Sequence, residues 1–225
     1  MMKHTEKELA AIKDEVSQMW RLVLSQLEKT KQAVLTNDVE LAREVISREK
    51  RVNLLELKID SDCENYIALY NPVAVDLRLV LSLFKICGTL ERIADFAEGI
   101  TRCIIEESAE WFSDELKEIL RVETMFSTVI EMLSDAYAAL ESENTKLSGK
   151  ILAKDNCVDE IYRNAVYVLA EAIKTNAIAA DCGLKTMIAI RKIERIGDHC
   201  SNIVEEIVFY IDAKVLKHSK IKNNL

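Results

Sequence analysis

The chain has 225 residues and a formal net charge of −8; charged residues make up 30% of it and aromatic residues only 6%. A nucleic-acid partner is not expected, because phosphate binding needs basic patches and none is visible in the sequence. The same acidity disfavours direct contact with an anionic membrane. One proline and five glycines are too few for a turn-rich β fold, so the composition predicts an all-α protein with long helices.

Location is predicted from what the sequence lacks. No uninterrupted apolar run approaches the roughly 18–20 residues that span a bilayer, and the first residues lack the apolar core of a signal peptide. We therefore expect a cytoplasmic protein without direct membrane insertion. The six cysteines are scattered, form no C-x-x-C pair and mostly have apolar neighbours, so we interpret them as reduced core residues.

The first helix is predicted from an apolar stripe that begins at Leu9. Apolar residues then recur every three or four positions, which is typical of a helix with one buried face, and the pattern stops after about Leu35. Thr36 or Asn37 is expected to cap the next helix, because acidic residues follow in its first turn.

The second helix is predicted to end near Tyr70, because Pro72 disfavours helical geometry at Asn71. A third helix then runs from about Val73 to Glu107. Each helix has about 30 residues, which corresponds to roughly 45 Å.

The same three elements occur twice. Apolar positions of the first helix recur 106 residues later, and the motif Glu-Arg-Ile-x-Asp at 91–95 recurs 103 residues later at 194–198. An internal repeat of this kind, with long helices and short loops, predicts two tandem three-helix bundles related by pseudo-two-fold symmetry, six long helices in all. We place the repeats at residues 1–108 and 109–225, with the stretch 106–115 as the candidate boundary and no flexible linker.

Acidic side chains recur one helical turn apart in the repeated motif. Glu194 and Asp198 are four residues apart, so both carboxylates lie on one face of the helix, and Asn202 continues that line. The corresponding face of the first copy carries Glu91, Asp95 and Glu98.

The second helix of each copy carries a related step, which is Asp155 and Asp159 in one copy and Glu49 and Asn53 in the other. Each copy can therefore direct acids from two helices toward one region, if the faces meet. Carboxylates suit hard or borderline cations, and several together are costly without cations because like charges raise one another's pKa. The pattern predicts divalent or trivalent cations, and His199 could add a nitrogen ligand.

An ordinary solvated helix face is the competing interpretation, because Glu-x-x-x-Asp steps are common on helices. Arg92 and Arg195 favour it, since each can pair with the aspartate three residues on. The repetition of the whole motif in both copies, among surface residues that differ, favours a site. A purely structural helical protein stays open as an alternative.

Catalysis is not expected from this sequence, so the chain is predicted not to be an enzyme. It contains no Gly-rich phosphate loop, no H-E-x-x-H and no Ser/His/Asp spacing that supports nucleophilic chemistry. A metalloenzyme of the di-iron bundle type is the remaining enzymatic alternative. Such bundles use Glu-x-x-His, whereas His199 follows Glu194 by five residues.

The stretches "NPVAVDLR", "LERIADFAEGI" and "IERIGDHCSNI", together with "TNDVELAREVI", resemble the PhoU family of phosphate-uptake regulators, and the resemblance covers nearly the whole chain. It implies tandem three-helix bundles and a cytoplasmic accessory protein that is often a homodimer. It further implies that the chain acts with the ATPase subunit of a phosphate ABC transporter and a sensor histidine kinase. Such a protein restrains uptake and phosphate-starvation signalling when phosphate is plentiful.

The resemblance also implies metal clusters on the acidic motifs, with iron, zinc, manganese or magnesium as candidate cations. The ligands it implies are Glu91, Asp95, Glu194, Asp198, Asp155 and Asp159, and the additional candidates are Glu49, Glu98, His199 and Asn202. The first copy departs from the family pattern, because Phe96 and Gly99 stand where a His and an Asn are expected and Asn53 replaces an acid. These departures predict the second repeat as the better metal site.

Overall fold

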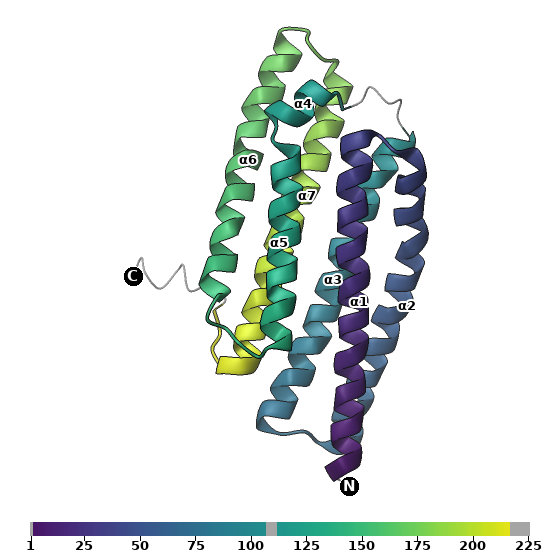
Figure 1. Ribbon diagram of the computed structural model, residues 1–225, viewed down its shortest axis with the longest axis vertical. Coiled ribbons are helices and arrows are strands. Elements are labelled where there is room, and N and C mark those ends of the chain that lie inside the picture. The colour runs from purple at the N-terminus through teal and green to yellow at the C-terminus, as the bar shows by residue number, and fades with distance from the viewer. Residues whose placement is uncertain (1, 107–111, 217–225) are drawn as a thin grey trace.

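Two helical bundles lie side by side in the computed structural model, which describes residues 2–106 and 112–216, with side chains from Thr5 onward (Figure 1). Every regular element within these ranges is a helix, which confirms the predicted all-α class and the tandem bundles. The first bundle contains α1 (Met2–Thr36), α2 (Val39–Tyr70) and α3 (Ala74–Glu106). The second contains α4 (Asp114–Ile119), α5 (Val122–Glu141), α6 (Ser148–Lys174) and α7 (Ala180–Asp212).

The second bundle differs from the expected three long helices. The short helix α4 precedes α5, and α5 has only 20 residues against 35 in α1. Ser113 caps α4, because its hydroxyl accepts a hydrogen bond from the Leu116 amide at 3.3 Å. Arg121 then adopts a left-handed backbone conformation, which separates the two helices. Residues 107–111 of the expected repeat boundary lie outside the described ranges.

The ends of α1 and α2 follow local chemistry. Asp38, not Thr36 or Asn37, caps α2, since its side chain accepts from the Leu41 amide at 2.9 Å. Asn37 instead takes a left-handed conformation that ends α1, which asparagine tolerates better than most residues. At the far end, α2 stops at Tyr70 as the proline predicts, and Asn71 takes the left-handed conformation that commonly caps a helix.

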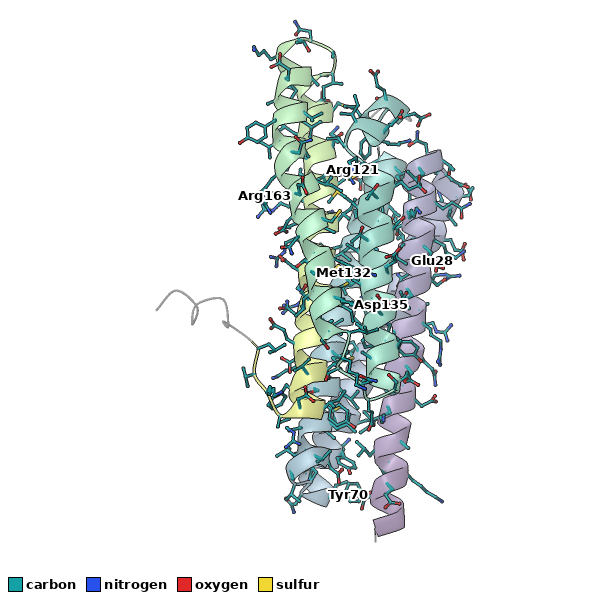
Figure 2. All side chains as sticks on the ribbon, turned by 60° about the vertical axis from the view of Figure 1, so that its left-hand side comes forward. Glu28, Tyr70, Arg121, Met132, Asp135 and Arg163 are labelled. Atoms are coloured by element: carbon teal, nitrogen blue, oxygen red, sulfur yellow. The ribbon has the colours of Figure 1, made fainter. Side chains whose placement is uncertain are left out.

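A single hydrophobic core extends through both bundles. Equivalent repeat positions such as Trp20 and Phe126 are both fully buried in it. The Trp20 indole donates a hydrogen bond to the Leu133 carbonyl at 3.1 Å, which ties α1 to α5. These two helices run beside each other in both views of the molecule (Figures 1 and 2). The Ser82 hydroxyl ties α3 to α7 through the Glu206 carbonyl at 3.1 Å, so the repeats form one tightly packed unit.

The cysteines are all free thiols. Cys63, Cys87 and Cys200 are buried, in agreement with their interpretation as core residues, whereas Cys103, Cys157 and Cys182 are only partly buried. None of the helices in the described ranges combines the length and the apolar character that a bilayer crossing needs.

Candidate metal centre

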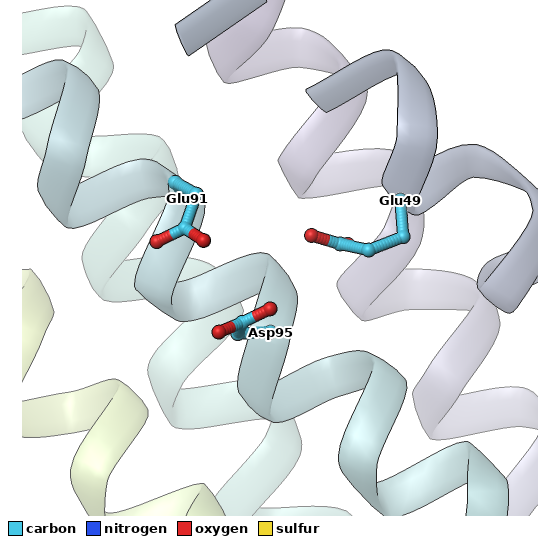
Figure 3. Close-up of side chains that lie close together, drawn as sticks. All are labelled: Glu49, Glu91 and Asp95. Atoms are coloured by element: carbon cyan, nitrogen blue, oxygen red, sulfur yellow. The ribbon is translucent and has the colours of Figure 1, made fainter. Parts of the chain in front are cut away.

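Three carboxylates of the first repeat converge between α2 and α3. Glu49 reaches across from α2 toward Glu91 and Asp95, which lie one turn apart on α3 (Figure 3). One oxygen from each of the three lies within 4.8 Å of the other two. The i, i+4 spacing on α3 places its two acids on one face, and the packing of α2 against α3 brings the third acid to them. The cluster supplies three oxygen ligands at a spacing that one hard cation can bridge.

Glu49 is the most enclosed member of this cluster, with 6% of its surface exposed. One carboxylate oxygen accepts a hydrogen bond from the Gln26 amide of α1 at 3.4 Å, whereas its Oε1 is buried without a partner in the described structure. Burial raises the Glu49 pKa to about 7, and the nearby carboxylates of Asp95, Glu98 and Glu91 add to that shift. A buried, unpaired carboxylate oxygen beside other acids is stabilised by a cation.

Burial and neighbouring carboxylates also disfavour the charged form of Glu91. Burial raises its pKa to about 7, and Asp95 and Glu56 raise it further, while Arg92 opposes them. Arg92 makes no ion pair with Asp95 within 4.0 Å in the described structure, so the expected intrahelical pair does not neutralise this cluster. The remaining candidate on this face, Glu98, pairs with Arg102 at 2.6 Å.

Glu56 belongs to this acidic face as well, although it was not among the residues predicted from the sequence. Its pKa is raised by burial and by Asp60 and Asp95, and its carboxylate lies next to Gly88 of α3. The signal was present in the sequence, because Glu56 follows Glu49 by seven residues and so returns to the same face of α2.

The second repeat also brings acids of α6 and α7 together, in a looser arrangement. Burial raises the Glu194 pKa, and the charges of Asp198 and Asp159 raise it further. Within the described ranges, no three ligand-type side chains here come as close as the first-repeat group. The more closely spaced carboxylates therefore lie in the first repeat, although the motif departures favour the second; which repeat binds a cation better stays a prediction.

Basic partners explain part of this difference. Arg195 donates to Asp198 at 3.0 Å, which is the pair expected from their spacing. Asp159 lies 3.7 Å from Arg163, which points outward from α6 (Figure 2). Asp155 accepts a hydrogen bond from Ser201 at 2.9 Å. The acids of the second repeat are thus partly compensated within the chain.

A groove of about 950 Å³ opens along these acids between α6 and α7. Asp155, Asp159 and Asp198 line it, together with Asn202 and Glu205. This is the outer acidic face that the sequence predicted for the second repeat, with Asn202 on the same line as the aspartates.

His199 lies away from both acidic faces, between α3 and α7. It is 4% exposed, and its ring stacks on Phe96 with centroids 5.6 Å apart. Burial lowers its pKa to about 4, and the charges of Arg195 and Arg92 lower it further. Its Nε2 has no hydrogen-bond partner in the described structure. This position indicates packing between the repeats, so His199 is not grouped with the carboxylates.

A family model described as the PhoU domain matches residues 16–104 and 122–207. The phosphate-specific transport system accessory protein PhoU of Escherichia coli (strain K12) is 34% identical over 212 residues, which cover 94% of this chain and 86% of that protein. The PhoU homolog of Aquifex aeolicus (strain VF5) is 33% identical over 216 residues, with 96% of each chain covered.

Solved structures agree with these matches. PhoU from Pseudomonas aeruginosa superposes with a TM-score of 0.84 at 28% identity, covering 93% of this chain and 99% of that one. The phosphate transport system regulatory protein PhoU from Streptococcus pneumoniae shares the fold, with a TM-score of 0.85 at 23% identity and coverage of 95% and 99%. The names of the sequence relatives describe an accessory protein, in agreement with the prediction that the chain is not an enzyme. The chain belongs to the PhoU family.

Proposed function

We propose that this chain is a cytoplasmic accessory protein of a phosphate transport system, which restrains phosphate uptake and starvation signalling when phosphate is plentiful. The support is its membership of the PhoU family and the names of relatives that align over nearly its whole length. In this role the chain acts as an adaptor between the ATPase subunit of a phosphate ABC transporter and a sensor histidine kinase, and it pairs with a second copy of itself.

Cation binding at the acidic faces is the chemical basis of this proposal. It is carried by one observation: Glu49 presents a buried, unpartnered oxygen to Glu91 and Asp95, and the three groups lie within 4.8 Å. Iron, zinc, manganese and magnesium all accept carboxylate oxygens, so the donor set fits a divalent or trivalent cation without selecting one. A bound cation neutralises acids that would otherwise repel one another.

The same cation provides a route by which phosphate is sensed. Bare carboxylates repel phosphate, whereas a cation at the mouth of the cluster can accept phosphate oxygens into its own coordination shell. Asp95 is exposed and Glu49 is buried, so a cation held here has one side open to solvent. A transporter ATPase or a kinase that docks on this face would then contact a surface whose charge depends on cation and phosphate.

A helical adaptor without metal is the second candidate, and the second repeat favours it. The Arg195–Asp198 and Arg163–Asp159 pairs neutralise acids there without any cation. In that case the motifs serve as intrahelical ion pairs and partner contacts. A di-iron enzyme has no comparable support, because the Glu-x-x-His step is absent from the sequence.

A reporter of phosphate-starvation genes tests the proposal in cells grown with abundant phosphate. The triple variant E49Q/E91Q/D95N is expected to release reporter expression at unchanged protein level, because it removes the charge that holds the cation. The matched control E28Q/E64Q/E160Q neutralises three exposed acids on α1, α2 and α6 and is expected to keep the reporter repressed. Full repression in the first variant would leave only the metal-free adaptor.

A further inference from the structure

The groove between α6 and α7 has an excess of negative charge along its length. Its acidic lining consists of Asp155, Asp159, Asp198 and Glu205, and Arg195 is the one cationic lining residue within the described ranges. Arg195 already pairs with Asp198. The groove therefore favours a cationic occupant over a neutral or acidic one.

The described chain ends at this groove. Helix α7 stops at Asp212, and Ala213 takes a left-handed conformation that turns the backbone away from the helix axis. Leu216 then lines the groove beside the acids. With Val215, Leu216 also lines a small cavity of about 80 Å³ next to Lys85 and Phe209. The last described residue is thus held at the edge of the acidic surface.

The nine residues that follow are basic. The segment Lys217–Leu225 reads "KHSKIKNNL" and contains three lysines, one histidine and no acidic residue. An extended chain spans at most about 3.3–3.6 Å per residue, so Lys217 and Lys222 can lie about 17 Å apart. Along α6 the groove extends from Ser148 to Asp159, a distance of about 17 Å at 1.5 Å per residue. The lysines match the groove in charge and in length.

We propose that residues 217–225 dock in the α6–α7 groove as an intramolecular occupant, with the lysines facing the second-repeat aspartates. The docked segment competes with cations for those aspartates. This competition rests on the proposed function, whereas the docking itself does not. Cation binding in the two repeats would then differ, since the carboxylate cluster of the first repeat has no such competing segment.

The strength expected for this contact is modest, so the segment is a reversible competitor. An exposed lysine–carboxylate pair shifts an equilibrium by about 1.5- to 5-fold, and added salt screens it. Tethering compensates for the weak contacts, because a short linker gives an effective concentration of the order of millimolar. Raised cation concentration is expected to displace the segment.

Carbodiimide cross-linking of the full chain tests the docking without any metal. This reagent joins a lysine amine to a carboxylate only when the two are in contact. We expect cross-links from Lys217, Lys220 or Lys222 to the groove acids, and their loss in 0.5 M NaCl. A mixture of unlabelled and ¹⁵N-labelled protein identifies links between copies. Links only between copies, or links spread over exposed acids elsewhere, would overturn the proposal.

Mn²⁺ titration then tests the competition, in the E49Q/E91Q/D95N background so that the second repeat is read alone. Adding K217Q/K220Q/K222Q is expected to tighten Mn²⁺ binding about 3- to 30-fold at low salt, and the matched change K7Q/K50Q/K146Q is expected to leave it unchanged. Equal Mn²⁺ affinities with and without the K217Q/K220Q/K222Q change would overturn the proposed competition. If cross-links form but neither repeat of the otherwise unaltered chain binds Mn²⁺, the docking holds and the proposed cation function fails.

Discussion

Phe96 and His199 occupy equivalent positions of the two repeats, and their rings stack on each other at 5.6 Å with an angle of 23° between their planes. Helices α3 and α7 run in opposite directions along this contact, because Ser82 meets Glu206 while Lys192 reaches Gly99. The stacked pair therefore marks the pseudo-two-fold axis of the protein. Phe96 of the first repeat thus gives His199 of the second an aromatic partner in the joint between the bundles.

Replacing His199 with phenylalanine is predicted to remove a pH dependence of stability. The pKa of His199 is lowered to about 4 in the folded chain from 6.5, so the unfolded chain binds more protons between these values. Stability of the wild type should rise with pH from about 4 to 6.5, by up to about 3 kcal/mol from this residue. Urea unfolding at pH 5 and pH 7.5 measures the difference between wild type and H199F. The same difference in unfolding free energy at both pH values would contradict the lowered pKa of His199.

Glu49 is predicted to make the metal-free protein less stable as pH rises, which is opposite to the effect of His199. The Glu49 pKa is raised from 4.5 to about 7, so the unfolded chain loses its proton first as pH rises. Wild-type stability should fall between pH 4.5 and 7 relative to E49Q, by up to about 3 kcal/mol. Added Mn²⁺ should restore the stability of the wild type and leave the stability of E49Q little changed. Unfolding curves at pH 5 and pH 8, with and without Mn²⁺, check both statements.

A methyl group at Gly197 is predicted to disturb the second-repeat site without unfolding the protein. A Cβ there would come 2.7 Å from the Asp155 carboxylate, which must then move from its hydrogen bond with Ser201. Helix propensity offsets the strain by about 1 kcal/mol, so stability should change little. G197A is expected to weaken Mn²⁺ binding in the second repeat. The control G149A, where a Cβ meets nothing within 4 Å, should keep it.

Removing the amine of Lys85 is predicted to weaken the joint between the repeats. Lys85 lies 3.1 Å from Glu206, whose side chain is 7% exposed, so K85M removes an ion pair from a buried carboxylate. The expected loss of unfolding free energy is about 1–3 kcal/mol. K154M is the control, because Lys154 pairs with the largely exposed Glu131 and Asp135. This substitution should lower the free energy of unfolding by less than about 1 kcal/mol. Equal losses in chemical denaturation would contradict the role of Lys85.

The helical repeat was predictable because its signals are local. The apolar stripe of α1 and the stop at Asn71 depend on residues adjacent in the chain, and the structure confirms both. The short helix α4 and the late start of α5 were not predicted, since they depend on the left-handed residue Arg121, whose conformation no local motif indicates.

The candidate site was predictable along each helix but not between helices. The i, i+4 acids on α3 were identified correctly as sharing a face, and the Arg195–Asp198 pair followed from its spacing. Whether Glu49 meets them depends on the rotation of α2 about its own axis, which the packing of the whole bundle sets. For that reason the sequence favoured the second repeat, whereas the tight cluster forms in the first.

Mn²⁺ titration of the metal-stripped full chain at pH 8 tests the cation site most directly. The wild type and the control E28Q/E64Q/E160Q are expected to bind the same number of ions. E49Q/E91Q/D95N is expected to bind at least one fewer, because it loses the carboxylates that lie within 4.8 Å of one another. The same stoichiometry and affinity in all three proteins would contradict the account.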